Sequence, residues 1–152
     1  LNLHVEMLRN LKAVVPVSGV FNIWEHYKFE KSRGVEEVST MKPACGHTKE
    51  NFQLLSPTLK IEKMRNQRDV LLQLPPFWLL HGEDDTTVPH VSTDEFGQAL
   101  LNNGIPKEKV NVHILKEGQG GGHAQIITDA MGLTVAADCS SPFISTLQGL
   151  LS

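Results

Sequence analysis

The sequence lacks long apolar runs and any excess of basic residues, and each absence excludes a class of function. No uninterrupted apolar stretch approaches the roughly 20 residues of a membrane-spanning helix, and the first residues have no signal-peptide layout. The 14 lysines and arginines are scattered and outnumbered by 17 acidic residues, so we expect no nucleic-acid partner. With 152 residues, 40% of them hydrophobic, the chain can bury a core. No feature indicates a compartment or an oligomeric state.

Metal and cofactor sites also lack their usual sequence patterns. The two cysteines, Cys45 and Cys139, have no Cys-x-x-Cys or zinc spacing. Gly118-Gln119-Gly120 resembles half of a dinucleotide-binding fingerprint, but His123 occupies the third glycine position, so we expect neither a metal nor an organic cofactor. Six further histidines have no ligand spacing and are interpreted as structural or surface residues: His4, His26, His47, His81, His90 and His113.

Hydrophobic periodicity predicts three strands separated by helices. The strands are 13–17, 77–80 and 110–115, and the clearest helix lies between the last two. Ser92 and Glu95 have the spacing of a capping box at its start. Further helices are predicted over 1–11, 61–72 and 142–151, with short surface helices between 24 and 55. Strand, helix and strand in this order form a βαβ unit, so we expect an α/β fold in which a parallel sheet lies between two layers of helices.

One edge of this predicted sheet requires a neighbour outside the chain. A parallel sheet is covered on both faces and protected at its edges, whereas the strand 13–17 is flanked by sequence on one side only. The chain also begins at Leu1 without an initiating methionine. We therefore expect that part of the domain is missing on the N-terminal side.

Acidic residues and a histidine follow two neighbouring strands. Asp84 and Asp85 come after the second strand, and His123 follows the third. Because functional groups in open α/β sheets lie beyond the carboxyl ends of the strands, an aspartate and an imidazole should meet there. Such a pair activates a nucleophile: the carboxylate orients the imidazole, which accepts the nucleophile's proton. The alternatives are a turn-forming aspartate and a histidine that merely begins a helix.

Three segments resemble the α/β-hydrolase family. HGEDDTTVP at 81–89 resembles the turn that carries the triad acid, which falls on Asp85 rather than Asp84. GGHAQIITDAM at 121–131 is similar to the segment that carries the triad histidine, His123. SGVFNIWEHYKFEKSRGVEEVSTMKPA at 18–44, with LLSPTLKI at 54–61, resembles the cap-like insertion of the branch that contains prenylcysteine methylesterase-like and kynurenine formamidase-like enzymes.

The resemblance implies the C-terminal half of the family's domain. The Gly-x-Ser-x-Gly nucleophile elbow and the His-Gly-Gly oxyanion loop are absent from these residues. Ser18 follows a predicted strand, but it lacks the glycine two positions upstream, so it is a weak candidate nucleophile. Residues 1–152 are therefore expected to be the C-terminal part of one incomplete α/β-hydrolase domain, with a cap-like segment at about 22–55.

The activity that the resemblance implies is carboxylic ester hydrolysis of the Ser-His-Asp type. The catalytic residues in this chain would be Asp85 and His123, and the serine would come from the missing N-terminal half. The implied substrate is a small-molecule or prenylated ester. Two alternatives stay open: an arylformamidase-like hydrolase, and a catalytically inactive fragment or pseudo-hydrolase that acts as an interaction module. We expect residues 1–152 alone to be inactive.

Overall fold

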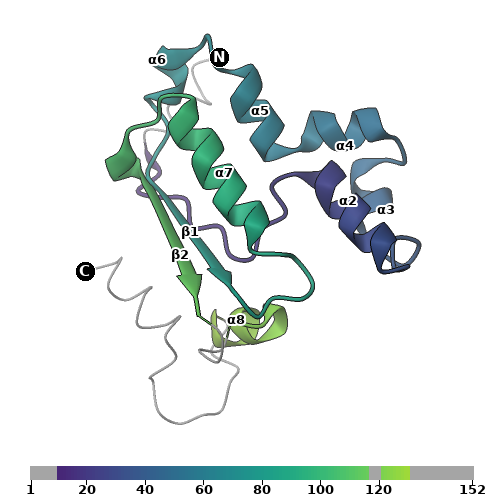
Figure 1. Ribbon diagram of the computed structural model, residues 1–152. Coiled ribbons are helices and arrows are strands. Elements are labelled where there is room, and N and C mark those ends of the chain that lie inside the picture. Colours follow the sequence, from purple (N-terminus) through teal and green to yellow (C-terminus); the bar gives the residue numbers. More distant parts are fainter. Residues whose placement is uncertain (1–9, 117–120, 131–152) are drawn as a thin grey trace.

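The computed structural model describes residues 10–116 and 121–130, and its centre is a two-stranded parallel sheet (Figure 1). Strand β1 (Phe77–Gly82) pairs with β2 (Val110–Leu115), and Phe77 lies opposite Val110. Helix α7 (Val91–Asn102) and the short 3-10 helix η1 (Lys107–Lys109) connect the two strands. This part of the chain has the mixed α/β class and the βαβ unit that the sequence predicts. The predicted helix 142–151, most of the helix 1–11, the Gly118–Gly120 segment and Cys139 lie outside the described residues.

The prediction of a third regular strand at 13–17 was wrong. The segment runs parallel to β1, but only two isolated bridges join them, Val14 to Phe77 and Val17 to Leu80. Trp78 N donates to Val14 O at 2.9 Å, and Leu80 N donates to the carbonyl oxygen of Pro16 itself at 3.0 Å. Proline has no N–H, so Pro16 cannot complete the ladder between these bonds.

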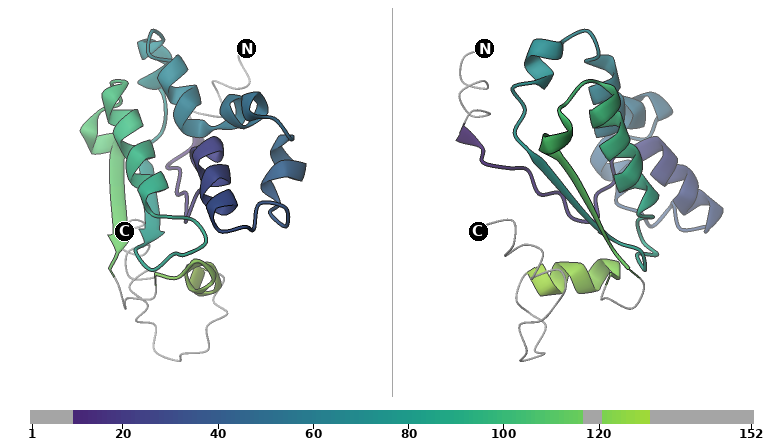
Figure 2. Two further views of the ribbon diagram at one scale, coloured as in Figure 1. Left: turned by 45° about the vertical axis from the view of Figure 1, so that its right-hand side comes forward. Right: turned by 60° about the vertical axis from the view of Figure 1, so that its left-hand side comes forward.

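Helix α7 covers one face of the sheet, and the helices of residues 23–63 lie on the same side (Figure 2). The larger apolar core lies between β1 and α7, where Phe77 and Leu79 pack with Phe96 and Leu100. Gly97 permits this close approach, since a Cβ on it would lie 2.8 Å from Val112 Cγ2. A smaller apolar cluster joins Leu80, Leu115 and Ile126, with Val17 against it. This second cluster attaches the segment after β2 to the sheet.

Short helices occupy the segment between 24 and 55, as predicted, and a further short helix extends to residue 63. They are α2 (Ile23–Ser32), α3 (Met41–Cys45), α4 (Lys49–Leu55) and α5 (Pro57–Lys63), followed by α6 (Arg68–Leu71). The single helix predicted over 61–72 was wrong, because a turn at 64–67 separates α5 from α6. The turn contains Asn66, a poor helix former, and it lets Ile61 and Leu71 enter the same core.

The capping box predicted at Ser92 was also wrong. Helix α7 begins at Val91 with His90 as its N-cap residue, and no side chain caps its amides. The Ser92 hydroxyl instead accepts a hydrogen bond from the backbone N–H of Phe21 at 3.0 Å. A tertiary partner from a segment 71 residues away thus replaces the local one. The predicted stop is present, since α7 ends at Asn102 and Gly104 has a φ of +90°.

Candidate active site

Asp85 lies in the turn that follows β1, and its carboxylate is completely buried. Oδ1 accepts hydrogen bonds from the backbone N–H groups of Thr87 at 2.9 Å and Val88 at 2.8 Å. Aspartate side chains commonly close a turn in this way. Val88 is itself buried and Pro89 follows it, so the turn is fixed against the core. Asp85 therefore acts as the turn-forming aspartate of the alternative interpretation. Its other oxygen, Oδ2, stays available for further donors.

His123 is the first residue of helix α8 (His123–Ala130), which lies beyond the carboxyl ends of both strands (Figure 1). Its Nδ1 lies 2.8 Å from Asp85 Oδ2. Two contacts fix this placement: Ile126 packs in the cluster with Leu80 and Leu115, and Gly121 touches the backbone of Gly82. The structure thus brings together the two side chains that the sequence places after neighbouring strands. Their catalytic role stays a prediction.

The hydrogen bonds to Asp85 determine its charge. Burial by itself would raise the pKa of this carboxyl, but hydrogen bonds from His81, Val88 and His123 outweigh it and hold the pKa well below its usual range. The carboxylate is therefore ionised at neutral pH and can accept a hydrogen bond from Nδ1–H of His123. The Nε2 lone pair of His123 then remains free to accept a proton, and 30% of the side chain is exposed.

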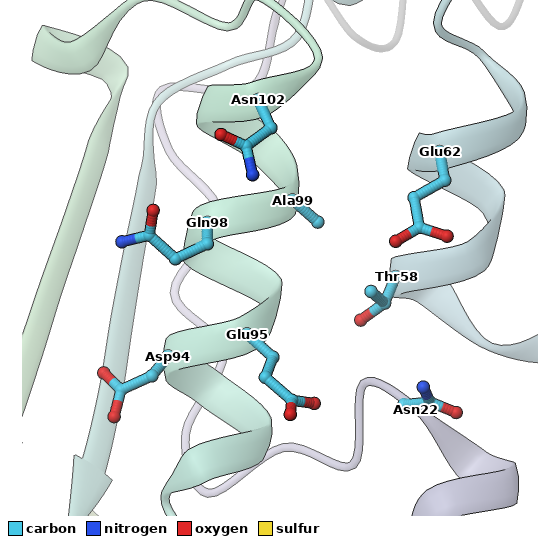
Figure 3. Close-up of a pocket in the computed structure, with 8 residues that line it drawn as sticks. All are labelled: Asn22, Thr58, Glu62, Asp94, Glu95, Gln98, Ala99 and Asn102. Atoms are coloured by element: carbon cyan, nitrogen blue, oxygen red, sulfur yellow. The ribbon is translucent and has the colours of Figure 1, made fainter.

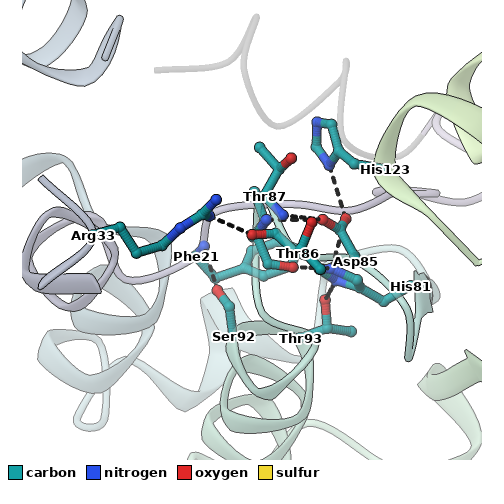
Figure 4. Close-up of polar contacts among 10 residues, drawn as sticks. Phe21, Arg33, His81, Asp85, Thr86, Thr87, Ser92, Thr93 and His123 are labelled. Atoms are coloured by element: carbon teal, nitrogen blue, oxygen red, sulfur yellow. Dashed lines mark hydrogen bonds and ion pairs between the residues drawn. The ribbon is translucent and has the colours of Figure 1, made fainter. Parts of the chain in front are cut away.

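Two further residues contact the acid turn, and neither was predicted to lie at the site. His81, on β1, places Nε2 3.2 Å from Asp85 Oδ2, and Arg33, at the end of α2, donates from Nη1 to the Thr86 carbonyl oxygen (Figure 4). Our sequence interpretation gave His81 only a structural or surface role. A usable signal existed, because a histidine at the end of an apolar strand stands four residues before the aspartate. No signal in the sequence points to Arg33.

The remaining candidates have other surroundings. Glu83 is exposed and lies 3.5 Å from Lys116, whereas Asp84 is half-buried. Ser18 is buried with a φ of +49°, and its hydroxyl has no hydrogen-bond partner among the described residues. Its backbone N–H donates to Leu80 O at 2.9 Å.

The aromatic residues between 21 and 29 mostly pack against other rings. Phe21 stacks on Phe96 in the core at a centroid distance of 4.3 Å, and Trp24 and Tyr27 contact each other and Phe52. Phe29 is different: it lines a small hollow of about 100 Å³ together with His26 of the same helix and Pro89 and Val91 near the acid turn. A larger hollow of about 370 Å³ separates α5 from α7 (Figure 3). Glu62 and Glu95 line it, and neither Asp85 nor His123 does.

Among the described residues, no group of three or more histidine, cysteine, aspartate or glutamate side chains is arranged to hold a metal ion. None of the helices within 10–116 and 121–130 is long and apolar enough to cross a membrane.

Comparison with known proteins identifies a distant relationship to α/β-hydrolases of the esterase type. The chain is 30% identical over 109 residues to the probable isoprenylcysteine alpha-carbonyl methylesterase of Arabidopsis thaliana, a match that covers 72% of this chain and 21% of that protein. The chain thus spans about a fifth of the length of this curated relative. The acetyl ester-xyloside bifunctional hydrolase of Caldicellulosiruptor lactoaceticus has a similar fold, with a TM-score of 0.52 and 19% identity over 91% of this chain and 42% of that one. No family model matches.

Proposed function

We propose that residues 1–152 form the C-terminal part of an α/β-hydrolase domain that hydrolyses carboxylic esters, with a cap-like segment at about 22–55. The observation that carries the proposal is the 2.8 Å contact between His123 Nδ1 and the buried Asp85 carboxylate. The two residues follow parallel strands in the order acid then histidine, which is the order in α/β-hydrolases. The distant homology to a methylesterase supports the same chemistry.

In the proposed mechanism, His123 Nε2 takes the proton of a serine hydroxyl supplied by residues outside this chain. The serine oxygen attacks the ester carbonyl, and His123 returns the proton to the alcohol that leaves. Water then attacks the acyl-serine by the same route, and the products are a carboxylic acid and an alcohol. Asp85 holds the imidazole in the Nδ1–H tautomer and stabilises the imidazolium at each step. The chain needs no metal for these steps.

The finer proposal is an isoprenylcysteine methyl ester as substrate, because the Arabidopsis relative is described as a methylesterase for that group. The bond from Arg33 to the Thr86 carbonyl supports a cap-like role for α2, since it attaches this helix directly to the acid turn. A kynurenine-type formamide is the runner-up substrate. Comparing kcat/KM for a prenylcysteine methyl ester, an aryl formamide and p-nitrophenyl acetate ranks the three substrate classes.

The first experiment separates the roles of this chain and of the missing nucleophile. Residues 1–152 alone should not hydrolyse p-nitrophenyl acetate above the blank, because removal of nucleophile and oxyanion donors leaves almost no catalysis. If the isolated chain does hydrolyse this ester and Ser18→Ala abolishes the activity, Ser18 is the nucleophile.

The second experiment uses a polypeptide in which the upstream half of the domain precedes residues 1–152. There His123→Ala should lower kcat by roughly four orders of magnitude. Asp84→Ala is the matched control and should have a mild effect, because the adjacent Asp85 holds the imidazole. A large loss of kcat in Asp84→Ala together with an unchanged kcat in Asp85→Ala would assign the triad acid to Asp84. If this polypeptide hydrolyses none of the two esters and the formamide, the alternative of a pseudo-hydrolase that acts as an interaction module is favoured.

A further inference from the structure

His81 is the one titratable side chain besides His123 that the structure places directly on the Asp85 carboxylate, within the described part of the chain. Its side chain is completely buried. Nε2 lies 2.8 Å from the carbonyl oxygen of Val88 and 3.2 Å from Asp85 Oδ2, and Nδ1 lies 2.6 Å from the hydroxyl of Thr93. Figure 4 shows both rings directed at the same carboxylate.

These contacts determine where the proton of the His81 ring resides. The two oxygens near Nε2 belong to a carbonyl and an ionised carboxylate, and neither can donate. Nε2 therefore carries a proton and shares it between Val88 and Asp85. The Thr93 hydroxyl can donate to Nδ1, so both ring nitrogens are satisfied and the ring cannot flip without losing bonds.

Asp85 is consequently held by four donors. Backbone N–H groups bind Oδ1, and the two imidazoles, from β1 and from α8, bind Oδ2. The other titratable groups near the pair come from α2: His26 interacts electrostatically with both Asp85 and His123, and it is paired with Glu30 at 3.3 Å. With Oδ1 fixed by the turn, the position of Oδ2 depends on the donors around it, and His81 is the donor that belongs to the rigid sheet.

We propose that His81 is a positioning residue that fixes Oδ2 of Asp85, and through it the Nδ1–H tautomer of His123. The effect of His81 on catalysis rests on the proposed function, whereas its effect on the tautomer of His123 does not. Without the His81 donor, the buried carboxylate would lose one of two side-chain bonds and gain freedom to turn away from His123. His123 would then populate both neutral tautomers, and the fraction with a free Nε2 would fall.

Nitrogen NMR of the 152-residue chain tests this directly, because the ¹⁵N shifts of an imidazole distinguish its tautomers and require no turnover. At neutral pH we expect His123 as the Nδ1–H form and His81 as the Nε2–H form. His81→Met fills the volume without a donor and should give His123 in both tautomers. His81→Gln restores an N–H near the position of Nε2 and should restore the single form. His113→Gln is the matched control, since His113 stacks on Trp78 and should leave His123 unchanged.

A second variant keeps the test decisive if His81→Met does not fold. Thr93→Val removes the hydroxyl that holds Nδ1 of His81 and should shift His123 in the same direction, by less. A pure Nδ1–H His123 in a folded His81→Met or Thr93→Val variant would overturn the proposal.

The longer, active polypeptide gives the catalytic readout. There His81→Met should lower kcat by about tenfold to a hundredfold with little change in KM, as expected for the loss of one hydrogen bond to a charged group. If that polypeptide hydrolyses no ester while the tautomers behave as expected, the proposed function fails and the positioning role stands. An active polypeptide with unchanged kcat in His81→Met would overturn the inference instead.

Discussion

Replacing Gly82 with alanine should separate Asp85 from His123 without altering either side chain. A Cβ built on Gly82 lies 1.7 Å from the carbonyl oxygen of Gly121, and real Cβ atoms essentially never approach another heavy atom within 3.0 Å. The difference between these two distances, about 1.3 Å, is the smallest displacement that removes the overlap. Because the atom in conflict belongs to the backbone, it cannot rotate away.

The displacement would act on His123, which lies two residues after Gly121. The Nδ1 to Oδ2 distance is 2.8 Å, and N–H···O hydrogen bonds extend to roughly 3.2 Å, so a shift of this size would break the bond. Overpacking costs about 1 to 3 kcal/mol, and a bond to a charged group contributes about 1.5 to 3 kcal/mol. Since 30% of the His123 side chain is exposed, we expect a total loss in unfolding free energy of about 2 to 4 kcal/mol.

Denaturant unfolding and the imidazole nitrogen shifts of the 152-residue chain measure these two effects. Gly122→Ala is the matched control, because a Cβ at Gly122 meets no atom within 4 Å. The control should change the unfolding free energy by less than about 1 kcal/mol and keep His123 in the Nδ1–H form. The reasoning is refuted if Gly82→Ala unfolds at the same denaturant concentration as Gly122→Ala and retains that tautomer.

Three further predictions concern stability. Ser92→Ala removes the acceptor of the Phe21 N–H and should lower the unfolding free energy by about 1 to 2 kcal/mol in denaturant titrations; an unchanged midpoint would contradict this. Burial lowers the pKa of His26 from its ordinary 6.5, despite the opposing effect of Glu30. The chain should therefore lose stability as the pH falls below 6.5, and His26→Gln should make the unfolding free energy less dependent on pH in this range. The lowered pKa of Asp85 adds stability that is present above 3.8 and lost as the pH falls further, and Asp85→Asn should abolish that acid-dependent loss.

The sequence is most informative where local pattern and tertiary environment agree. β1 is a continuous apolar run that is buried on both faces, and α7 combines an apolar stripe with a glycine stop. The approach of Asp85 to His123 follows from topology alone, because the carboxyl ends of adjacent parallel strands lie side by side.

Predictions fail where a distant partner replaces a local one. Ser92 has the spacing of a cap, yet its hydroxyl bonds to Phe21, which no local pattern reveals. Pro16 was visible in the sequence, but the cost of its missing N–H depends on which neighbouring carbonyl lies opposite it. His81 resembled a core histidine, and burial alone would have been consistent with that interpretation. Its contacts with Asp85 and Val88 depend on the turn that brings these two residues back to the strand end.

Asp85 and His123 are held in place by contacts within this chain. The backbone amides of the turn fix Oδ1 of Asp85, the contact between Gly82 and Gly121 seats the start of α8, and Ile126 packs that helix against the sheet. None of these contacts involves the nucleophile that the proposed reaction requires. The Asp85–His123 pair should therefore form in residues 1–152 without any further segment. If the isolated chain shows the Nδ1–H tautomer of His123 but no hydrolysis, its inactivity is due to the missing nucleophile and oxyanion donors, and not to a disordered acid–base pair.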